Sequence, residues 1–191
     1  MIIIVDYEMG NLRSVQKVFE RIGQAAEVSD KPEAVARAER LVVPGVGAFG
    51  DAMRALRERG LVEPIRDFCA TGRPLLGICL GLHVIAAAFG GKAEPGTSGG
   101  YGAIDVEIIE SDGILSGYPV KIRVWASHAD EVVIVPPGFT RLAKSAVCGN
   151  EAIALTEKHI YGLQWHPEVS HSENGRLVYE NFNRITLGQS G

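Results

Sequence analysis

The stretch LLGICLG, residues 75–81, places a cysteine between two glycines at the junction of two apolar segments. Residues 75–78 are typical of a strand buried on both faces, and a helix is expected over 80–89. The spacing G-x-C-x-G has the form of a nucleophile elbow in which Cys79 replaces serine. Glycines relieve steric crowding in such a turn, and the helix N-terminus favours the thiolate. The alternative is a buried core cysteine beside glycines that serve packing.

Strands and helices alternate on the N-terminal side of this stretch. Apolar, β-branched runs predict strands at 2–5, 26–28 and 41–43. Apolar spacing and breaker residues predict helices at 12–22, capped by Asn11, and at 32–38, 51–58 and 62–70. This alternation predicts an α/β fold with a doubly wound, mostly parallel central sheet flanked by helices, of the flavodoxin-like kind.

The pattern changes after Gly90 and Gly91. Short alternating segments predict additional antiparallel or mixed strands, at 103–109, 120–125, 131–135, 141–146 and 152–155. A buried strand at 160–165 and a helix at 174–185 follow. Because the sequence contains no repeat, low-complexity tract or linker, one domain over 1–191 is expected.

Composition excludes several classes of protein. The chain is 46% hydrophobic and 22% charged, with a net charge of −4 and no basic run, which argues against a nucleic-acid partner. Its apolar runs are too short to cross a membrane. Cys69, Cys79 and Cys148 have no paired or metal-ligand spacing, and no secretion signal is recognisable. We therefore expect a cytoplasmic protein with free thiols, no metal and no cofactor.

A second motif, QWHPE at residues 164–168, carries a possible base and its orienting group. A cysteine nucleophile needs a base, and the base needs a third group to hold it. His166 can exchange a proton with Cys79, while Glu168 can hold the imidazole ring. The alternative is a histidine at a strand end beside a solvated carboxylate.

A third motif, PGVGAFG at residues 44–50, follows a predicted strand. Its glycines allow backbone N–H groups to face a cleft, so Gly45 and Val46 could form an oxyanion hole with the N–H of Leu80. The alternative is a loop without a ligand. A phosphate loop is disfavoured because the motif lacks the Lys-Ser/Thr ending.

Together these motifs resemble the class I (triad-type) glutamine amidotransferases, and the resemblance covers nearly the whole chain. It implies Cys79, His166 and Glu168 as nucleophile, base and orienting acid. It also implies that L-glutamine is hydrolysed through a glutamyl-thioester, with ammonia passed to a synthase. The substrate-binding residues that it implies are Gly47, His83, Ser127 and His128, although His128 taken alone would be a loop histidine.

The two halves of the chain resemble different subfamilies. Residues 6–15 and 44–53 are similar to the glutaminase subunit of imidazole glycerol phosphate synthase, which makes histidine biosynthesis with a cyclase partner the leading expectation. Residues 100–102, 125–132 and 166–169 are similar to the glutaminase subunit of GMP synthetase, so the alternative is that subunit or an amidotransferase subunit that serves another ammonia acceptor. Val169 stands where histidine-pathway subunits carry lysine. Glu8 and His83 replace a glycine and a glutamine that are usual in the family, changes that could lower activity in the absence of a partner.

Two interpretations from other functional classes stay open. One is a different cysteine-elbow hydrolase of similar fold, such as a γ-glutamyl hydrolase or related peptidase. The other is an interaction module that kept the fold after losing activity. The chain is too short to contain a synthase domain, so a glutaminase would need a separate ammonia-accepting synthase or cyclase subunit.

Overall fold

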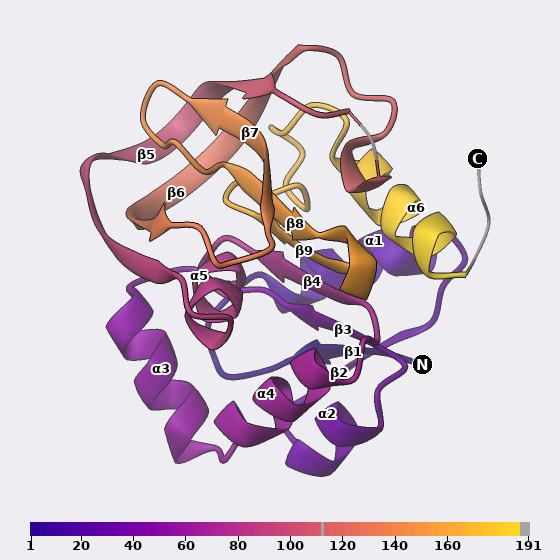
Figure 1. The fold of residues 1–191 in the computed structure, drawn as a ribbon. Coiled ribbons are helices and arrows are strands. Elements are labelled where there is room, and N and C mark those ends of the chain that lie inside the picture. Colours follow the sequence, from indigo (N-terminus) through magenta and orange to yellow (C-terminus); the bar gives the residue numbers. More distant parts are fainter. Residues whose placement is uncertain (112, 188–191) are drawn as a thin grey trace.

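The computed structural model describes residues 1–111 and 113–187, except for the side chains of 97 and 98. Within these residues one sheet of nine strands runs through the molecule in the order β2-β1-β3-β4-β9-β8-β7-β5-β6 (Figure 1). The first five strands in this order are mutually parallel, and the other four join antiparallel. The predicted α/β class with a parallel core and an antiparallel second half is thereby confirmed.

The parallel strands are short, and all of them are buried throughout except the edge strand β2, which is partly exposed. They are β1 (Ile2–Val5), β2 (Ala26–Ser29), β3 (Arg40–Val43), β4 (Leu75–Ile78) and β9 (Ile160–Leu163). Successive side chains of β1 enter two separate cores: Ile2 and Ile4 pack on one face, while Ile3 and Val5 pack on the other. A strand between two helical layers needs apolar residues at every position, which explains the continuous runs in the sequence.

Helices cover both faces of this parallel half (Figure 1). Helices α1 (Leu12–Arg21) and α6 (Gly175–Thr186) pack on the Ile2 face through residues such as Phe19 and Phe182. The opposite face is covered by α2 (Pro32–Arg37), α3 (Phe49–Glu58), α4 (Val62–Ala70) and α5 (Leu80–Ala88).

The antiparallel half extends the sheet beyond β9. It consists of β8 (Ala152–Leu155), β7 (Thr140–Ser145), β5 (Lys92–Ile108) and β6 (Lys121–Ile134), with short 3₁₀ turns at Gly113–Leu115 and Thr156–Lys158. Strands β5 and β6 form a long hairpin whose register shifts between the pairs Pro95–Asp130 and Gly100–His128. Such a shift bends a strand pair and re-aims side chains.

This hairpin corrects two sequence predictions. The strands expected at 120–125 and 131–135 are one strand, β6, and the strand expected at 103–109 begins earlier, at Lys92. The glycine-rich segment before Tyr101 and the polar residues around Asp130 are typical of turns, which obscured the pairing. Both segments remain extended because each pairs with the other around the register shift.

One helix start and one helix cap also differ from expectation. Helix α3 begins at Phe49, two positions before the expected 51. Asn11 does precede α1, but its side chain makes no capping bond to the backbone and instead accepts a hydrogen bond from the Ser14 hydroxyl at 3.1 Å.

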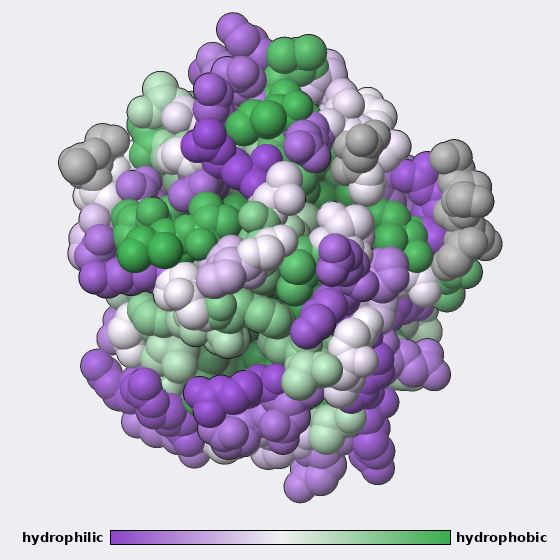
Figure 2. All heavy atoms as spheres, viewed as in Figure 1, coloured by the Kyte–Doolittle hydropathy of each residue, from purple (hydrophilic) through white to green (hydrophobic). Residues whose placement is uncertain are grey.

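The surface in this view is divided between hydrophilic and apolar areas (Figure 2). An apolar area lies over the end of β6, where Val133 and Ile134 are exposed, while hydrophilic residues gather over α3 and α4. No helix in the described part of the chain has the length and hydrophobicity needed to span a bilayer.

Candidate active site

The turn between β4 and α5 holds Cys79 in an unusual backbone conformation. Its φ of 54° and ψ of −107° lie in a region that L-residues rarely adopt. A Cβ at Gly81 would overlap the carbonyl oxygen of Val43, and a Cβ at Gly77 would lie 2.5 Å from Cδ1 of Ile85. The two glycines therefore let α5 pack closely enough against β3 and β4 to enforce the turn, as the elbow motif predicts.

Parallel pairing of β4 with β9 brings the second motif to Cys79. Ile78 is in register with Leu163, and the backbone N–H of Cys79 donates to the carbonyl oxygen of Leu163 at 2.6 Å. The carboxyl ends of the two strands therefore meet at one edge of the sheet, and the chain that continues from β9 carries His166 past the cysteine.

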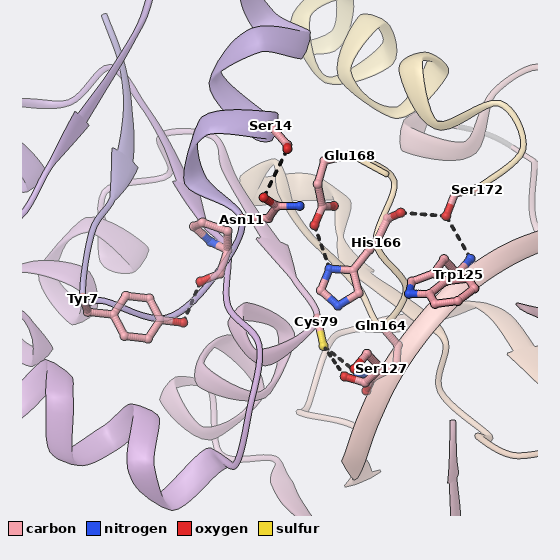
Figure 3. A network of polar contacts seen from close by, with 11 residues as sticks. Tyr7, Asn11, Ser14, Cys79, Trp125, Ser127, Gln164, His166, Glu168 and Ser172 are labelled. Atoms are coloured by element: carbon pink, nitrogen blue, oxygen red, sulfur yellow. Dashed lines mark hydrogen bonds and ion pairs between the residues drawn. The ribbon is translucent and has the colours of Figure 1, made fainter. Parts of the chain in front are cut away.

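Cys79, His166 and Glu168 lie in line in the order required of a triad (Figure 3). Nδ1–H of His166 donates to Oε1 of Glu168 at 2.7 Å, and the other ring nitrogen, Nε2, points toward the sulfur. The side chains of His166 and Glu168 are 4% and 1% exposed, so water competes little for these contacts. The backbone of His166 is anchored as well, because its carbonyl oxygen accepts from the Ser172 hydroxyl at 2.6 Å.

Charge at the site favours a protonated ring. Burial alone would lower the pKa of His166, but the Cys79 sulfur and the Glu168 carboxylate outweigh it and raise that pKa to about 10. The ring is then an imidazolium at neutral pH when the cysteine is a thiolate. Such a pair has both a nucleophile and a proton donor ready before substrate arrives.

A cleft of about 310 Å³ lies near Cys79, although Cys79 is not one of its lining residues. One wall is the loop before α3, and the other is the part of β6 around Ser127; the lining residues are Val46, Gly47, Ala48, Tyr101, Ser127, His128, Ala129 and Asp130. The sulfur of Cys79 lies 3.7 Å from the carbonyl oxygen of Ser127, although the cysteine itself is only 1% exposed. Three of the four residues predicted to bind substrate, namely Gly47, Ser127 and His128, therefore line one cleft.

The predicted oxyanion-hole residues are adjacent, but the hole is not open. The N–H of Leu80 donates to the carbonyl oxygen of Gly45 at 3.3 Å, so this amide cannot also face an oxyanion. The loop is held by Tyr7, whose hydroxyl donates to the carbonyl oxygen of Pro44 at 2.6 Å. Burial and the negative charge of Cys79 raise the pKa of Tyr7 far above its usual value, so its hydroxyl stays a donor.

His83 does not line the cleft. Its ring is buried, and Nε2–H donates to Oε1 of Gln164 at 2.8 Å, while Nε2 of Gln164 donates to the sulfur of Cys79 at 3.7 Å. Burial lowers the pKa of His83, which keeps the ring neutral at pH 7. The prediction that His83 contacts substrate is thus not supported by its position, which instead lets it orient Gln164.

Gln164 and Tyr7 were missed as functional residues. Gln164 belongs to the QWHPE motif and Tyr7 to the segment 6–15, but neither has spacing that indicates a role. A polar residue within an otherwise apolar strand end, such as Gln164 before Trp165, is the one signal that could have indicated a buried partner.

The other two cysteines are unsuited to chemistry. Cys69 and Cys148 are buried, and burial raises the pKa of Cys69 to about 11 and that of Cys148 further still. Thiols in such surroundings are inert. Among the described residues, no three His, Cys, Asp or Glu side chains cluster as ligands for a metal ion.

The sequence matches a known family over nearly its whole length. The profile of the family described as glutamine amidotransferase class-I matches residues 3–185. A glutamine-hydrolyzing GMP synthase subunit of Methanoculleus marisnigri is 52% identical over 154 residues, which cover 81% of this chain and 79% of that protein. The protein of the same name from Methanoregula boonei is 61% identical over 119 residues, which cover 62% of this chain and 65% of that one.

Solved structures agree in fold. A protein of Thermoplasma acidophilum, provisionally named as a GMP synthase subunit, aligns with a TM-score of 0.88 at 28% identity and covers 98% of this chain and 94% of that one. A glutamine amidotransferase of Thermotoga maritima aligns with a TM-score of 0.75 at 20% identity over 98% of this chain and 92% of that one, which shows the fold alone. With its cysteine elbow, its buried histidine and carboxylate and the profile match over residues 3–185, the chain belongs to the class I glutamine amidotransferase family.

Proposed function

We propose that this chain is the glutaminase subunit of a two-component GMP synthase. It would hydrolyse L-glutamine and deliver ammonia to a separate synthase subunit. The observation that carries the proposal is the 52% identity over 154 residues to a glutamine-hydrolyzing GMP synthase subunit. The arrangement of Cys79, His166 and Glu168 supports the chemistry.

In the first half of the reaction the Cys79 thiolate attacks the side-chain amide carbon of glutamine. Negative charge moves to the amide oxygen in the tetrahedral intermediate. As the intermediate collapses, the C–N bond breaks and His166 gives its Nε2 proton to the departing nitrogen. The products of this half are a glutamyl-thioester on Cys79 and free ammonia, and Glu168 holds the ring throughout.

In the second half water hydrolyses the thioester. His166, now neutral, takes a proton from the water molecule as it attacks, and the thiolate leaves. The sum is glutamine plus water giving glutamate plus ammonia, and the enzyme returns to its starting charge state.

Turnover requires a change at the oxyanion hole. The Leu80 amide can stabilise the tetrahedral intermediate only after its bond to the Gly45 carbonyl oxygen is broken. Removing one such donor typically costs about 10²–10³ in rate. The occupied amide and the nearly inaccessible sulfur therefore predict weak glutaminase activity from the isolated chain and stimulation by the synthase subunit.

Histidine biosynthesis, the leading expectation from the sequence, is not supported. The relatives from Methanoculleus marisnigri and Methanoregula boonei are both named as GMP synthase subunits. Val169, in the position after His-Pro-Glu, agrees with that alternative rather than with the imidazole glycerol phosphate synthase resemblance.

Reconstitution with a synthase subunit tests the proposal. GMP formation from its unaminated nucleotide precursor would be measured with ATP and either glutamine or ammonium as nitrogen source. We expect both sources to work with the wild-type chain and only ammonium to work with Cys79→Ala. Failure of glutamine to support GMP formation by the wild-type complex would contradict the assignment, as would retention of glutamine use by Cys79→Ala.

A further inference from the structure

A hydrogen bond outside the catalytic residues joins the two walls of the cleft. The backbone N–H of Phe49, the first residue of α3, donates to Oδ2 of Asp130 on β6 at 2.8 Å. Asp130 also lines the cleft. The two residues are separated by 81 positions in the sequence, so the bond ties the loop before α3 to the hairpin that forms the opposite wall.

Asp130 takes the place of a local helix cap. The residue before α3 is Ala48, whose methyl side chain cannot accept a hydrogen bond, so it provides no side-chain cap. The first N–H groups of a helix need acceptors, and a carboxylate is favoured there by the helix dipole. A side chain from β6 therefore completes the helix end, and this external cap explains why α3 starts earlier than its own sequence predicts.

The loop is held at its two ends. Tyr7 holds its start through the carbonyl oxygen of Pro44, and Asp130 holds its end through Phe49. Between these points lie Val46, which is 37% exposed, and Gly47, whose φ of 125° is accessible mainly to glycine. The two end contacts therefore set the location of this middle segment relative to Cys79.

We propose that Asp130 is a positioning residue that latches the loop before α3 to β6 and so sets the width of the cleft near Cys79. The proposal rests on glutamine hydrolysis at that cysteine. With the latch closed, the segment that contacts substrate is held at one distance from the sulfur. Without it, the loop end is released, the cleft widens, and substrate is held less well for attack.

The test uses paired variants that remove the bond from either side. Asp130→Ala removes the acceptor, whereas Asp130→Asn keeps an oxygen that can accept the same N–H. Phe49→Pro removes the donor at the first helical position, where proline is well tolerated, and Ala48 already has the extended conformation that precedes proline, with φ −82° and ψ 139°. Phe49→Ala controls for loss of the ring, which packs edge-on against His83 with centroids 6.5 Å apart.

Kinetics of the complex with its synthase provide the first readout. We expect Asp130→Ala and Phe49→Pro each to lower kcat/KM for glutamine by about 10- to 100-fold, the cost of a misplacement near 1 Å. For Asp130→Asn and Phe49→Ala, kcat/KM should stay within about threefold of wild type. The double variant Asp130→Ala/Phe49→Pro should have a kcat/KM no lower than that of the less active single variant, because either change alone already removes the bond. Asp105→Ala, on the exposed side of β5 and paired with Arg123, is the matched control.

A second readout does not depend on glutaminase activity. Hydrogen exchange at the Phe49 amide and alkylation of Cys79 by iodoacetamide should both accelerate at least about fivefold in folded Asp130→Ala, and neither should change in Asp130→Asn, because only the former loses the acceptor. The latch is overturned if these rates are unchanged in folded Asp130→Ala, if Asp130→Asn behaves like Asp130→Ala, or if the double variant shows the product of the single losses. A wild-type complex without glutaminase activity would instead refute the proposed function, and the exchange and alkylation rates would still decide on the latch.

Discussion

The side chain of Gln164 lies fully buried between His83 and the sulfur of Cys79. Its amide accepts from the neutral ring on one side and donates toward the sulfur on the other. A donor aimed at sulfur stabilises the thiolate form, and the hydrogen bond that the His83 N–H donates to Oε1 prevents the amide from rotating away. At the scale of single residues, the nucleophile is therefore supported by a pair of side chains in addition to His166.

Replacing Gln164 with leucine should impair both stability and catalysis. The buried Nε2–H of His83 would lose its acceptor, which costs roughly 1–3 kcal/mol in the free energy of unfolding. The thiolate would lose a donor, and we expect kcat to fall by roughly tenfold, the equivalent of about 1.4 kcal/mol. Chemical denaturation and steady-state glutaminase assays of the complex measure the two effects.

Gln164→Glu tests the effect of charge at the same position. A carboxylate there would be buried without a counterion next to the sulfur, so we expect stability not to recover and kcat to fall at least as far as in Gln164→Leu. If Gln164→Leu retained the wild-type kcat, the amide would have no part in preparing the sulfur.

At the scale of elements, the strand-turn-helix unit β4–Cys79–α5 was predictable, whereas the hairpin β5–β6 was predicted only as separate shorter strands. Continuous β-branched runs identify parallel strands because both of their faces are buried. The glycines at 77 and 81 identify the elbow because only glycine fits there. By contrast, alternation in the sequence indicates only parts of β5 and β6, because the segments around their register shift are held extended by pairing with each other and have no strand pattern of their own.

The features of the candidate site are likewise of two kinds, those that the sequence predicts and those that it does not. Cys79, His166 and Glu168 were predictable because each belongs to a short motif whose spacing reflects one chemical role. The parts supplied by distant segments were not predictable. These are the orientation of Gln164 by His83, the tether from Tyr7 to Pro44, and the cap on Phe49.

Gly81→Ala should disturb the elbow. The added methyl group would overlap the Val43 carbonyl, so α5 must move away from β3, at a cost of about 1–3 kcal/mol of stability. Gly50→Ala, at the second residue of α3, is the matched control, since a Cβ there meets no atom within 4 Å and alanine is the better helix former. Thermal unfolding compares the two. If Gly81→Ala and Gly50→Ala had equal melting temperatures, close approach of α5 to β3 would not be required.

At the scale of the whole molecule, the parallel half supplies the reactive groups and the antiparallel half supplies the far wall of the cleft. Strands β8 and β9 join the two halves, and the chain between β7 and β8 buries Glu151 at this junction. Oε1 of Glu151 accepts from the Ser145 hydroxyl at 2.7 Å, but Oε2 has no partner among the described residues. Burial raises the pKa of Glu151 to about 7 from a usual 4.5.

This carboxyl group makes stability depend on pH. Between about pH 4.5 and 7 the folded chain keeps a proton on Glu151 that the unfolded chain has released, so this contribution to stability decreases as the pH rises. A shift of this size corresponds to roughly 3 kcal/mol. Glu151→Gln, which cannot ionise and still accepts from Ser145, should gain stability relative to wild type by up to that amount from pH 5 to pH 8.

Urea denaturation at several pH values measures this difference. Glu27→Gln, a change at an exposed position of β2, is the control. If the difference in unfolding free energy between wild type and Glu151→Gln were the same at pH 5 and pH 8, the carboxyl would not titrate in this range.

The most direct test of the central claim is to trap the nucleophile with a chloroketone analogue of glutamine and map the adduct by mass spectrometry. The account predicts one adduct per chain in the wild-type complex, on the sulfur of Cys79, formed at least about 100-fold more slowly in His166→Ala because the thiolate loses its partner. Adduct formation at Cys69 or Cys148 instead, or an unchanged rate in His166→Ala, would contradict it.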